Sequence, residues 1–183
     1  MKLSIIIPTI SRPTLAATLQ SIAAQPLLRG DEILVVGDGP QPAAEAMFRA
    51  SKLPGRYIDG PLAHTWGGAQ RQFALPLAQG DLIAFMDDDD QYLPSACTYM
   101  RHLSDPAAVN LFRMYHSYGR VLWARRRLQV ANVSTQMAVI PNVPAKLGQW
   151  TARYEGDFDF ISDTAARFGA VRWHLPILSR WRA

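Results

Sequence analysis

The sequence of 183 residues is poor in cysteine and contains no long apolar run. The single cysteine, Cys97, excludes an internal disulfide and is typical of a reducing compartment, so we expect a cytoplasmic protein. No apolar segment approaches the roughly 18 residues that span a bilayer, which predicts a chain without a transmembrane segment. The apolar start is interrupted by Pro8 and followed by Arg12, so we interpret it as a buried strand rather than a signal peptide.

Internal repeats, low-complexity tracts and linker-like segments are also absent from the sequence. Apolar residues make up 49% of the chain and charged residues 19%, which is ordinary for a folded globular protein. The length suits one domain with a substantial core and is too short for two ordinary domains. We therefore predict one domain over residues 1–183, divided into unequal halves at about residue 104.

Positive charge is unevenly distributed along the chain, whose formal net charge is +4. The arginines of the second half are Arg113, Arg120, Arg125, Arg126, Arg127, Arg153, Arg167, Arg172, Arg180 and Arg182. A basic half favours a polyanionic partner, such as nucleic acid, an anionic lipid surface or a charged glycan. A composition that is generally rich in arginine would produce the same pattern.

The first half alternates between β-branched runs and segments with helical spacing of apolar residues. Strands are expected at residues 3–7, 32–36, 56–58 and 81–86, and helices at about 14–23, 42–50 and 67–78. This alternation predicts an α/β fold with right-handed crossovers and a mostly parallel central sheet that is covered by helices on both faces.

The pattern changes after Pro94, where a helix runs to about Ser104. Antiparallel strands are expected at residues 109–115 and 120–123, and a further strand at 133–140. A helix at 158–168 is ended by Gly169 and followed by a short strand at 171–174. The second half should therefore be small and mixed.

Four consecutive aspartates, Asp87–Asp90, directly follow the predicted strand 81–86. Ligands of open α/β sheets bind beyond the carboxyl ends of the strands, and clustered carboxylates are favourable there when a cation neutralises them. Mn²⁺ or Mg²⁺ fits, because both prefer oxygen ligands. In an extended chain Asp87 and Asp89 would converge on the metal, while Asp88 would point toward a sugar or a structural partner. A solvated acidic turn is the alternative.

Two further aspartates lie at the ends of predicted elements. Asp38 stands between glycines after the second strand, where it can accept hydrogen bonds from a nucleobase edge or form an Asx turn. Asp157 begins the predicted helix 158–168, where the helix dipole favours its ionised form. Helix capping alone would also explain an aspartate at that position.

Three cationic or metal-binding side chains complete the set of candidates. Arg71, on a helix that follows Gly67, can reach a phosphate group, and Arg12 has the same standing after the first strand. A surface position is the alternative for both. His174 could complete a metal shell, although a histidine in an apolar stretch is also commonly structural.

Four motifs in a characteristic order resemble the family-2 glycosyltransferases of GT-A fold, a Rossmann-like nucleotide-binding fold. They are Ile5-Ile6-Ile7-Pro8-Thr9, Val35-Val36-Gly37-Asp38-Gly39-Pro40, Gly68-Ala69-Gln70-Arg71-Gln72 before Ala78-Gln79-Gly80-Asp81, and Phe85-Met86-Asp87-Asp88-Asp89-Asp90. These motifs span residues 3–94, and beyond them Gly156-Asp157 also matches.

The resemblance implies metal-dependent transfer of a sugar from a nucleotide-diphosphate sugar, most simply a UDP-sugar, to an acceptor hydroxyl with inversion. It also implies a role for individual residues: Pro8, Thr9 and Asp38 would hold the nucleoside, Asp87 and Asp89 the metal, and Asp157 would be the general base. Arg12, Arg71 and Asp88 are expected to contact the nucleotide sugar.

Three departures from the family pattern stand out. Gly37 replaces the acid that usually precedes Asp38, and Gly156 replaces the glutamate that usually precedes Asp157, with Glu155 displaced by one position. The chain is also shorter than most relatives, which implies a minimal acceptor half and a missing C-terminal lid.

Two other functions remain open at this point. A nucleotidyltransferase would share the sheet and the acidic site, but the segment after the first strand lacks the expected glycine- and lysine-rich loop. A nucleic-acid-binding module is favoured by Trp123 and by the arginines Arg120, Arg125, Arg126 and Arg127, which combine a stacking ring with phosphate-pairing cations. Modified DNA as the acceptor would reconcile binding with transfer.

Overall fold

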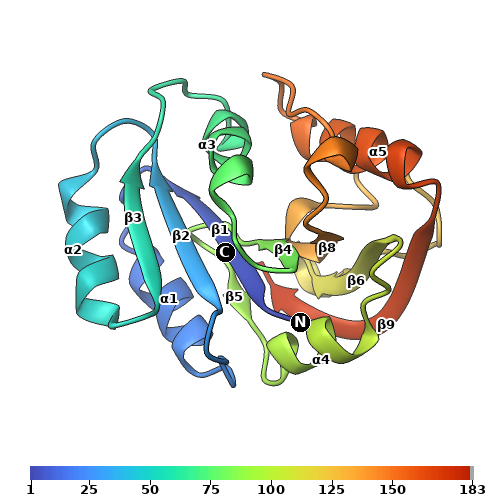
Figure 1. Ribbon diagram of the computed structural model, residues 1–183, viewed down its shortest axis with the longest axis horizontal. Coiled ribbons are helices and arrows are strands. Elements are labelled where there is room, and N and C mark those ends of the chain that lie inside the picture. The colour runs from blue at the N-terminus through green and yellow to red at the C-terminus, as the bar shows by residue number, and fades with distance from the viewer. Residues whose placement is uncertain (182–183) are drawn as a thin grey trace.

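The computed structural model describes residues 1–181, and its first half forms the predicted alternating unit (Figure 1). Strands β1 (Leu3–Thr9), β2 (Glu32–Gly37), β3 (Gly55–Asp59) and β4 (Leu82–Phe85) pair in parallel in the order β3-β2-β1-β4. The connections carry the helices α1 (Leu15–Ala23), α2 (Pro42–Ser51) and α3 (Gly68–Ala74), the last followed by the 3₁₀ turn η1 (Leu75–Leu77). The parallel half of the sheet is therefore confirmed.

The second half continues the same sheet with mixed pairing. Its strands are β5 (Gln91–Tyr92), β6 (Val109–Tyr115), β7 (Val121–Leu122), β8 (Ala138–Pro141) and β9 (Val171–Arg180). Its helices are α4 (Ala96–Leu103) and α5 (Gly156–Phe168), with 3₁₀ turns η2 (Ser117–Gly119), η3 (Thr135–Met137) and η4 (Pro144–Lys146). Strand β8 pairs antiparallel with β4 and β6, and β9 runs parallel to β6. Strand β5 pairs antiparallel with β9, and β7 pairs antiparallel with β6.

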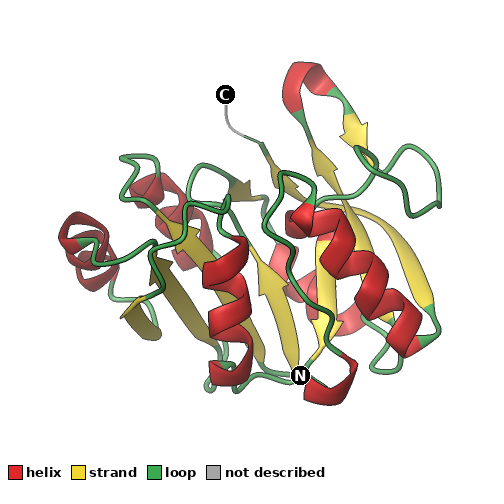
Figure 2. Cartoon of the chain, turned by 90° about the horizontal axis from the view of Figure 1, so that it is seen from above, coloured by secondary structure: helices red, strands yellow, loops and turns green. Residues whose placement is uncertain are grey.

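Successive strand residues feed two separate cores, because side chains alternate across the sheet. Ile5 and Ile7 pack with α1, α2 and α4 on one face, whereas Ile6 packs on the other face with α3 and α5. All three isoleucines are fully buried. Helices thus cover both faces, as the sequence predicts (Figure 2).

The last two strands differ from the prediction. The segment predicted as a strand at 133–140 contains the turn η3 first, so that β8 begins at Ala138. Strand β9 continues to Arg180 instead of ending near His174, and its register against β6 shifts around Pro176. A proline has no N–H to donate to the ladder, so it is accommodated at this irregularity rather than ending the strand.

The carboxyl ends of β1, β2 and β4 and the beginning of α5 lie at the same edge of the molecule (Figure 2). At this edge lie Thr9, Asp38 and the four aspartates of the first half, together with Asp157 of the second half. Among residues 1–181, no helix combines the length and the apolar character that crossing a membrane requires.

Candidate active site

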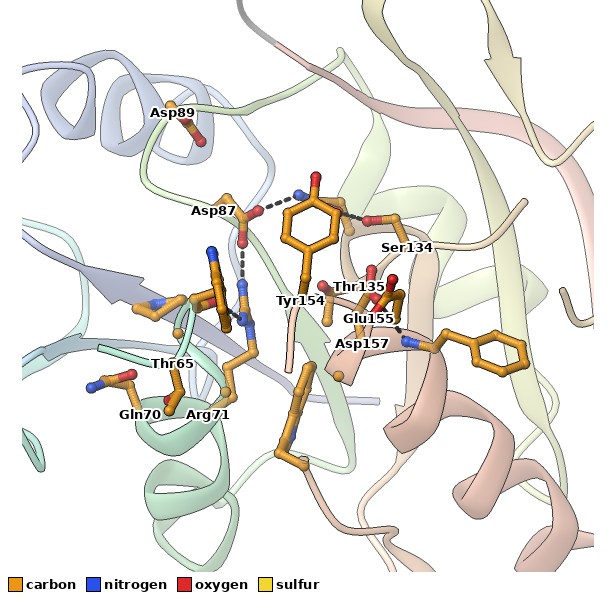
Figure 3. A pocket seen from close by; sticks show the side chains of 18 of the residues that line it. Thr65, Gln70, Arg71, Asp87, Asp89, Ser134, Thr135, Tyr154, Glu155 and Asp157 are labelled. Atoms are coloured by element: carbon orange, nitrogen blue, oxygen red, sulfur yellow. Dashed lines mark hydrogen bonds and ion pairs between the residues drawn. The ribbon is translucent and has the colours of Figure 1, made fainter. Parts of the chain in front are cut away.

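Nearly all the residues predicted for the site line one cavity of about 670 Å³ (Figure 3). They are Pro8, Thr9, Arg12, Asp38, Arg71, Asp87, Asp88, Asp89 and Asp157. The cavity lies between the loops that follow β1, β2 and β4 and the loop that leads into α5. The fold thus brings together side chains that are up to 149 positions apart, from Pro8 to Asp157.

The aspartates after β4 form a turn, and not the extended segment that would bring Asp87 and Asp89 together. The backbone N–H of Asp90 donates to the carbonyl oxygen of Asp87 at 3.2 Å, which closes the turn. Asp87 faces Arg71, and Asp89 lies apart from it (Figure 3). The two proposed metal ligands therefore share the cavity wall but are held by different partners.

Asp88 has a structural role in this turn. Its carboxylate is buried and accepts a hydrogen bond from Thr9 Oγ1 at 2.8 Å and one from Arg12 at 3.0 Å. The backbone N–H of Ile10 donates to it as well. Of the two roles considered for Asp88, the structural partner is the one that these contacts support, and they tie the end of β1 to the aspartate turn.

Asp89 lies at the cavity wall close to one guanidinium and two carboxylates. Burial raises its pKa, the guanidinium of Arg12 at 2.9 Å lowers it, and the carboxylates of Asp87 and Asp88 raise it further. Such mutual repulsion is relieved by a bound cation. Among residues 1–181, no group of three potential metal ligands gathers, so the aspartates fit a cation that takes one or two carboxylates and completes its shell with phosphate oxygens and water.

Arg71 is buried in the wall of the cavity, which excludes the surface position considered for it. Its guanidinium pairs with Asp87, donates to the carbonyl oxygen of Trp66 at 3.0 Å and lies over the ring of Trp150, 5.0 Å from its centre. Gly67 permits this close approach of Arg71, because its φ is +81° and an added Cβ would lie 2.8 Å from Arg71 Nη1 and 2.7 Å from Pro8 Cγ.

Asp38 is buried, and donors of the protein itself already engage its carboxylate. Ala63 N–H and Gln70 Nε2 donate to Oδ1 at 2.7 and 2.9 Å, and His64 N–H donates to Oδ2 at 3.0 Å. A carboxylate offers about four lone-pair sites, and most of them are used here. Asp38 therefore organises the loop at 60–67 that forms one wall of the cavity.

Asp157 lies in the first turn of α5 and faces the same cavity. Burial raises its pKa, while hydrogen bonds from the N–H of Phe158, at 2.7 Å, and from Ser134 lower it, as does the positive charge of Arg71. Glu155 is the N-cap residue, so capping does not account for Asp157. A buried carboxylate with a raised pKa is a better proton acceptor than an exposed one.

Gln136 is a residue of the site that sequence reasoning missed. Its side-chain amide donates to Asp87 at 2.7 Å and to Asp90 at 2.6 Å, while its oxygen accepts from Ser134 Oγ at 2.6 Å. Because Ser134 also lies against Asp157, this buried glutamine lies between the aspartate turn and the candidate base. A single glutamine between Thr135 and Met137 gives no sequence signal of such a role.

Two aromatic side chains at the cavity rim were also missed. Trp66 and Tyr154 are 63% and 76% exposed, and their rings meet edge to face with centroids 6.0 Å apart. They come from the loops before α3 and before α5. In the sequence, the only signal of these two residues would have been their position in loops next to predicted site residues.

The metal-ligand role predicted for His174 is not supported by its position. His174 lies on β9 outside the cavity, where its Nε2 is 3.0 Å from Asn110 Oδ1 and its ring stacks on Phe112. These contacts support the structural alternative, because the ring packs against side chains of the neighbouring strand β6.

The stacking role considered for Trp123 is also corrected. The ring is 4% exposed, and its Nε1 donates to the carbonyl oxygen of Leu111 at 3.2 Å. A buried ring offers no face to a nucleic-acid base, so one of the two features behind the nucleic-acid-binding hypothesis is removed.

Comparison with known proteins agrees with this geometry. Residues 4–171 match the family model described as glycosyl transferase family 2. A search of curated proteins found no match. Among solved structures, TarS from S. aureus superposes with a TM-score of 0.82 at 17% identity over 100% of this chain.

Two other similar structures are glucosyl-3-phosphoglycerate synthase from Mycobacterium tuberculosis and a mannosyltransferase from Pyrobaculum calidifontis. The first has a TM-score of 0.69 at 16% identity, with 100% of this chain and 72% of that chain covered. The second has a TM-score of 0.68 at 18% identity, with 96% of this chain and 55% of that chain covered.

The chain spans only part of the length of its relatives, namely 37% of TarS and 60% of a shorter TarS structure. The superpositions confirm the GT-A fold, and the family match extends over most of the chain and includes every residue described in the cavity. The chain belongs to glycosyl transferase family 2.

Proposed function

We propose that this protein transfers a sugar from a nucleotide-diphosphate sugar to an acceptor hydroxyl with inversion. The observation that carries the proposal is the cavity with Asp87 and Asp89 on one wall and the half-buried Asp157, with its raised pKa, on the other. That arrangement offers a place for a charged leaving group and a proton acceptor on opposite sides of a sugar.

The chemical step follows from these positions. Asp157 accepts the proton of the acceptor hydroxyl, whose oxygen forms a bond to the anomeric carbon. The bond from that carbon to the diphosphate oxygen breaks, and the nucleoside diphosphate leaves with the electron pair. Because base and leaving group lie on opposite faces of the sugar ring, the configuration inverts. A positioned general base typically contributes about 10²–10⁴-fold to the rate.

We propose Mn²⁺ or Mg²⁺ as the cofactor, held by Asp89 and Asp87. When bound, the cation would offset the negative charge that develops on the diphosphate. The buried Arg71 lies against Asp87 and would add a second positive charge on the same side. Related proteins support this choice, since the M. tuberculosis structure contains Mn²⁺ and UDP and the P. calidifontis structure contains Mn²⁺ and GDP-Man.

A UDP-sugar is the proposed donor, supported by a TarS structure in complex with UDP-GlcNAc. Pro8, Thr9 and Arg12 would contact the nucleotide beyond the end of β1, and Asp38 would hold the loop against which the nucleoside lies. Asp88 would act through Thr9 and Arg12. We place the reaction in the cytoplasm, since the lone buried Cys97 forms no internal disulfide.

Two substitutions test the division of roles. Asp89→Ala and Asp157→Asn should both abolish transfer, but only Asp89→Ala should weaken the Mn²⁺-dependent binding of UDP measured by calorimetry. Asp157→Asn should bind UDP like the wild type and lower kcat by about 10²–10⁴-fold.

Matched controls are Asp59→Ala and Asp163→Asn, since neither residue lines the cavity. Equal UDP affinity of Asp89→Ala and wild type in the presence of Mn²⁺ would contradict the metal assignment. Undiminished turnover of Asp157→Asn would remove the general base from the proposal.

A further inference from the structure

A long segment of the second half contains no negative charge. Residues 106–154 include seven arginines and lysines and neither aspartate nor glutamate. Since the whole chain has a net charge of only +4, this segment is more basic than the rest of the protein combined. Such segregation produces a positive potential over the elements that the segment builds.

Three of these charges stand together in the loop between β7 and η3. Arg125, Arg126 and Arg127 are exposed, and within residues 1–181 no carboxylate forms an ion pair with them. Arg120, at the start of the same region, is also exposed, has no carboxylate partner there and lines the cavity. We call these four residues the arginine loop.

The arginine loop is held in a defined shape. The side chain of Asn132 donates to the carbonyl oxygens of Arg125 and Arg127 at 2.8 and 2.7 Å, and accepts from the N–H of Ala124 at 2.9 Å. Trp123 anchors the loop beneath, with the guanidinium of Arg126 over its ring at 5.8 Å. Less conformational freedom is then lost when the arginines bind a ligand.

The loop leads directly into the cavity. After the arginines, Val130, Ala131, Val133 and Ser134 line the cavity, and Ser134 lies against Asp157. The hairpin of β6 and β7 and the loop after it project at the edge where α5 begins (Figure 2). An extended acceptor whose hydroxyl reaches Asp157 would continue along this segment toward Arg125, Arg126 and Arg127, which lie outside the cavity lining.

We propose that the acceptor is a flexible glycan or glycan-like molecule that carries phosphate groups, and that the arginine loop binds those phosphates. This inference rests on the proposed function and names its acceptor class. Guanidinium groups pair with phosphate oxygens through two parallel hydrogen bonds. A DNA duplex fits less well, because it is stiff over about 150 base pairs, whereas the hydroxyl must reach the half-buried carboxylate of Asp157 inside the cavity.

The test compares two variants that remove the same charge. Arg125, Arg126 and Arg127 are changed to glutamine in the loop variant, and Arg29, Lys52 and Arg56 in the control variant. The control residues are exposed and lie outside the cavity. The probe is fluorescently labelled long-chain inorganic polyphosphate, titrated at several NaCl concentrations with a chelator present, so that no metal links it to the aspartates.

The wild type and the control variant should bind the probe alike, and the loop variant at least 10-fold more weakly. Each lost phosphate contact reduces the slope of log K against log salt by about 0.7, so the loop variant should lose about 2 in slope. The double variant with Arg125→Gln and Arg127→Gln keeps the contact between Arg126 and Trp123. This double variant separates loss of charge from loss of loop structure. Its affinity for the probe should fall between the affinities of the wild type and the loop variant.

Equal weakening in the loop and control variants would overturn the proposal, because net charge alone would then explain binding. Tighter binding of duplex DNA than of polyphosphate at equal phosphate concentration would also overturn it in favour of nucleic acid. A parallel thermal-shift measurement with UDP and Mn²⁺ tests the proposed function separately. If UDP and Mn²⁺ caused no thermal shift, the proposed function would fail, and the phosphate-binding result could still be interpreted on its own.

Discussion

The side-chain amide of Gln136 donates a hydrogen bond to Asp87 at 2.7 Å and so fixes one carboxylate oxygen of the aspartate turn. The other carboxylate oxygen of Asp87 pairs with Arg71. Asp87 is thus held between a residue of α3 and a residue of the turn η3, which comes from the acceptor side of the cavity. Its orientation depends on both halves of the chain.

Gln136→Leu should weaken the proposed metal site without removing a proposed metal ligand. Partners that orient metal ligands typically contribute 10–100-fold to metal affinity, so the Mn²⁺ concentration for half-maximal activity should rise by about that factor. Mn²⁺ titrations of activity measure this concentration, with Gln91→Leu as the control, because Gln91 lies outside the cavity and its side chain accepts hydrogen bonds from Arg180. An unchanged Mn²⁺ requirement would mean that Gln136 does not position Asp87.

Asp88 and Asp89 should differ in their effect on stability, although they are neighbours. Asp88→Ala leaves Thr9 Oγ1 and the N–H of Ile10 without their acceptor, which should cost about 1–3 kcal/mol of unfolding free energy. Asp89→Ala removes one partly exposed ion pair with Arg12 and should change the unfolding free energy by less than about 0.5 kcal/mol. Urea unfolding of both variants decides this, and a larger loss for Asp89→Ala would refute the assignment.

The raised pKa of Asp157 predicts a pH-dependent gain in stability for Asp157→Asn. Above its folded-state pKa the wild type carries a half-buried negative charge, which costs folding free energy, whereas well below its usual pKa of 3.8 Asp157 is protonated in both states. Asp157→Asn should therefore melt at a higher temperature at pH 7.5, and the difference should narrow as the pH falls toward 3.8.

Asp163→Asn provides a control of opposite sign on the same helix. Its hydrogen bond with Arg167 lowers the pKa of Asp163, so the ionised form stabilises the fold above pH 3.8. The substitution should lower the melting temperature at pH 7.5 or leave it unchanged. Melting curves in which both variants shift in the same direction would show that the burial of Asp157 is not the cause.

Asn132→Ala should weaken phosphate binding by the arginine loop although it changes no charge. The substitution removes three hydrogen bonds that shape the loop, so more freedom is lost when the arginines bind. We expect polyphosphate affinity to fall several-fold while the salt dependence stays close to that of the wild type. The control is Gln129→Ala, a substitution in the same loop as Asn132. Asn142→Ala would not serve as a control, because the side-chain amide of Asn142 donates hydrogen bonds to carbonyl oxygens beside β4.

Much of the fold could be predicted from the sequence, because its signals are local. The run from Leu3 to Ile7 is apolar and β-branched, and it forms a strand that is buried on both faces. Gly169 ends α5 with a φ of +74°, as a glycine at that position commonly does. Strand β5 has only two residues and is defined by pairing with β9, which no local pattern records.

The residues of the cavity were predictable where a motif carried them, but their contacts were not. Asp38 and Asp88 line the cavity as expected, yet donors from the loop at 60–67 and from Thr9 occupy their carboxylates. Those donors become neighbours only through tertiary packing. The same holds for Gln136, which meets Asp87 across 49 positions of sequence.

The antiparallel pairing of β5 with β9 has a practical consequence for anyone who divides this chain. The strand that begins one residue after Asp90 is bordered by Ser179 and Arg180, near the opposite end of the polypeptide. A fragment that stops at about residue 104 would leave β4 and β5 with unpaired edges, and such edges recruit other chains. We therefore expect the nucleotide-binding half to aggregate when expressed alone, and co-expression of the two fragments to rescue its solubility.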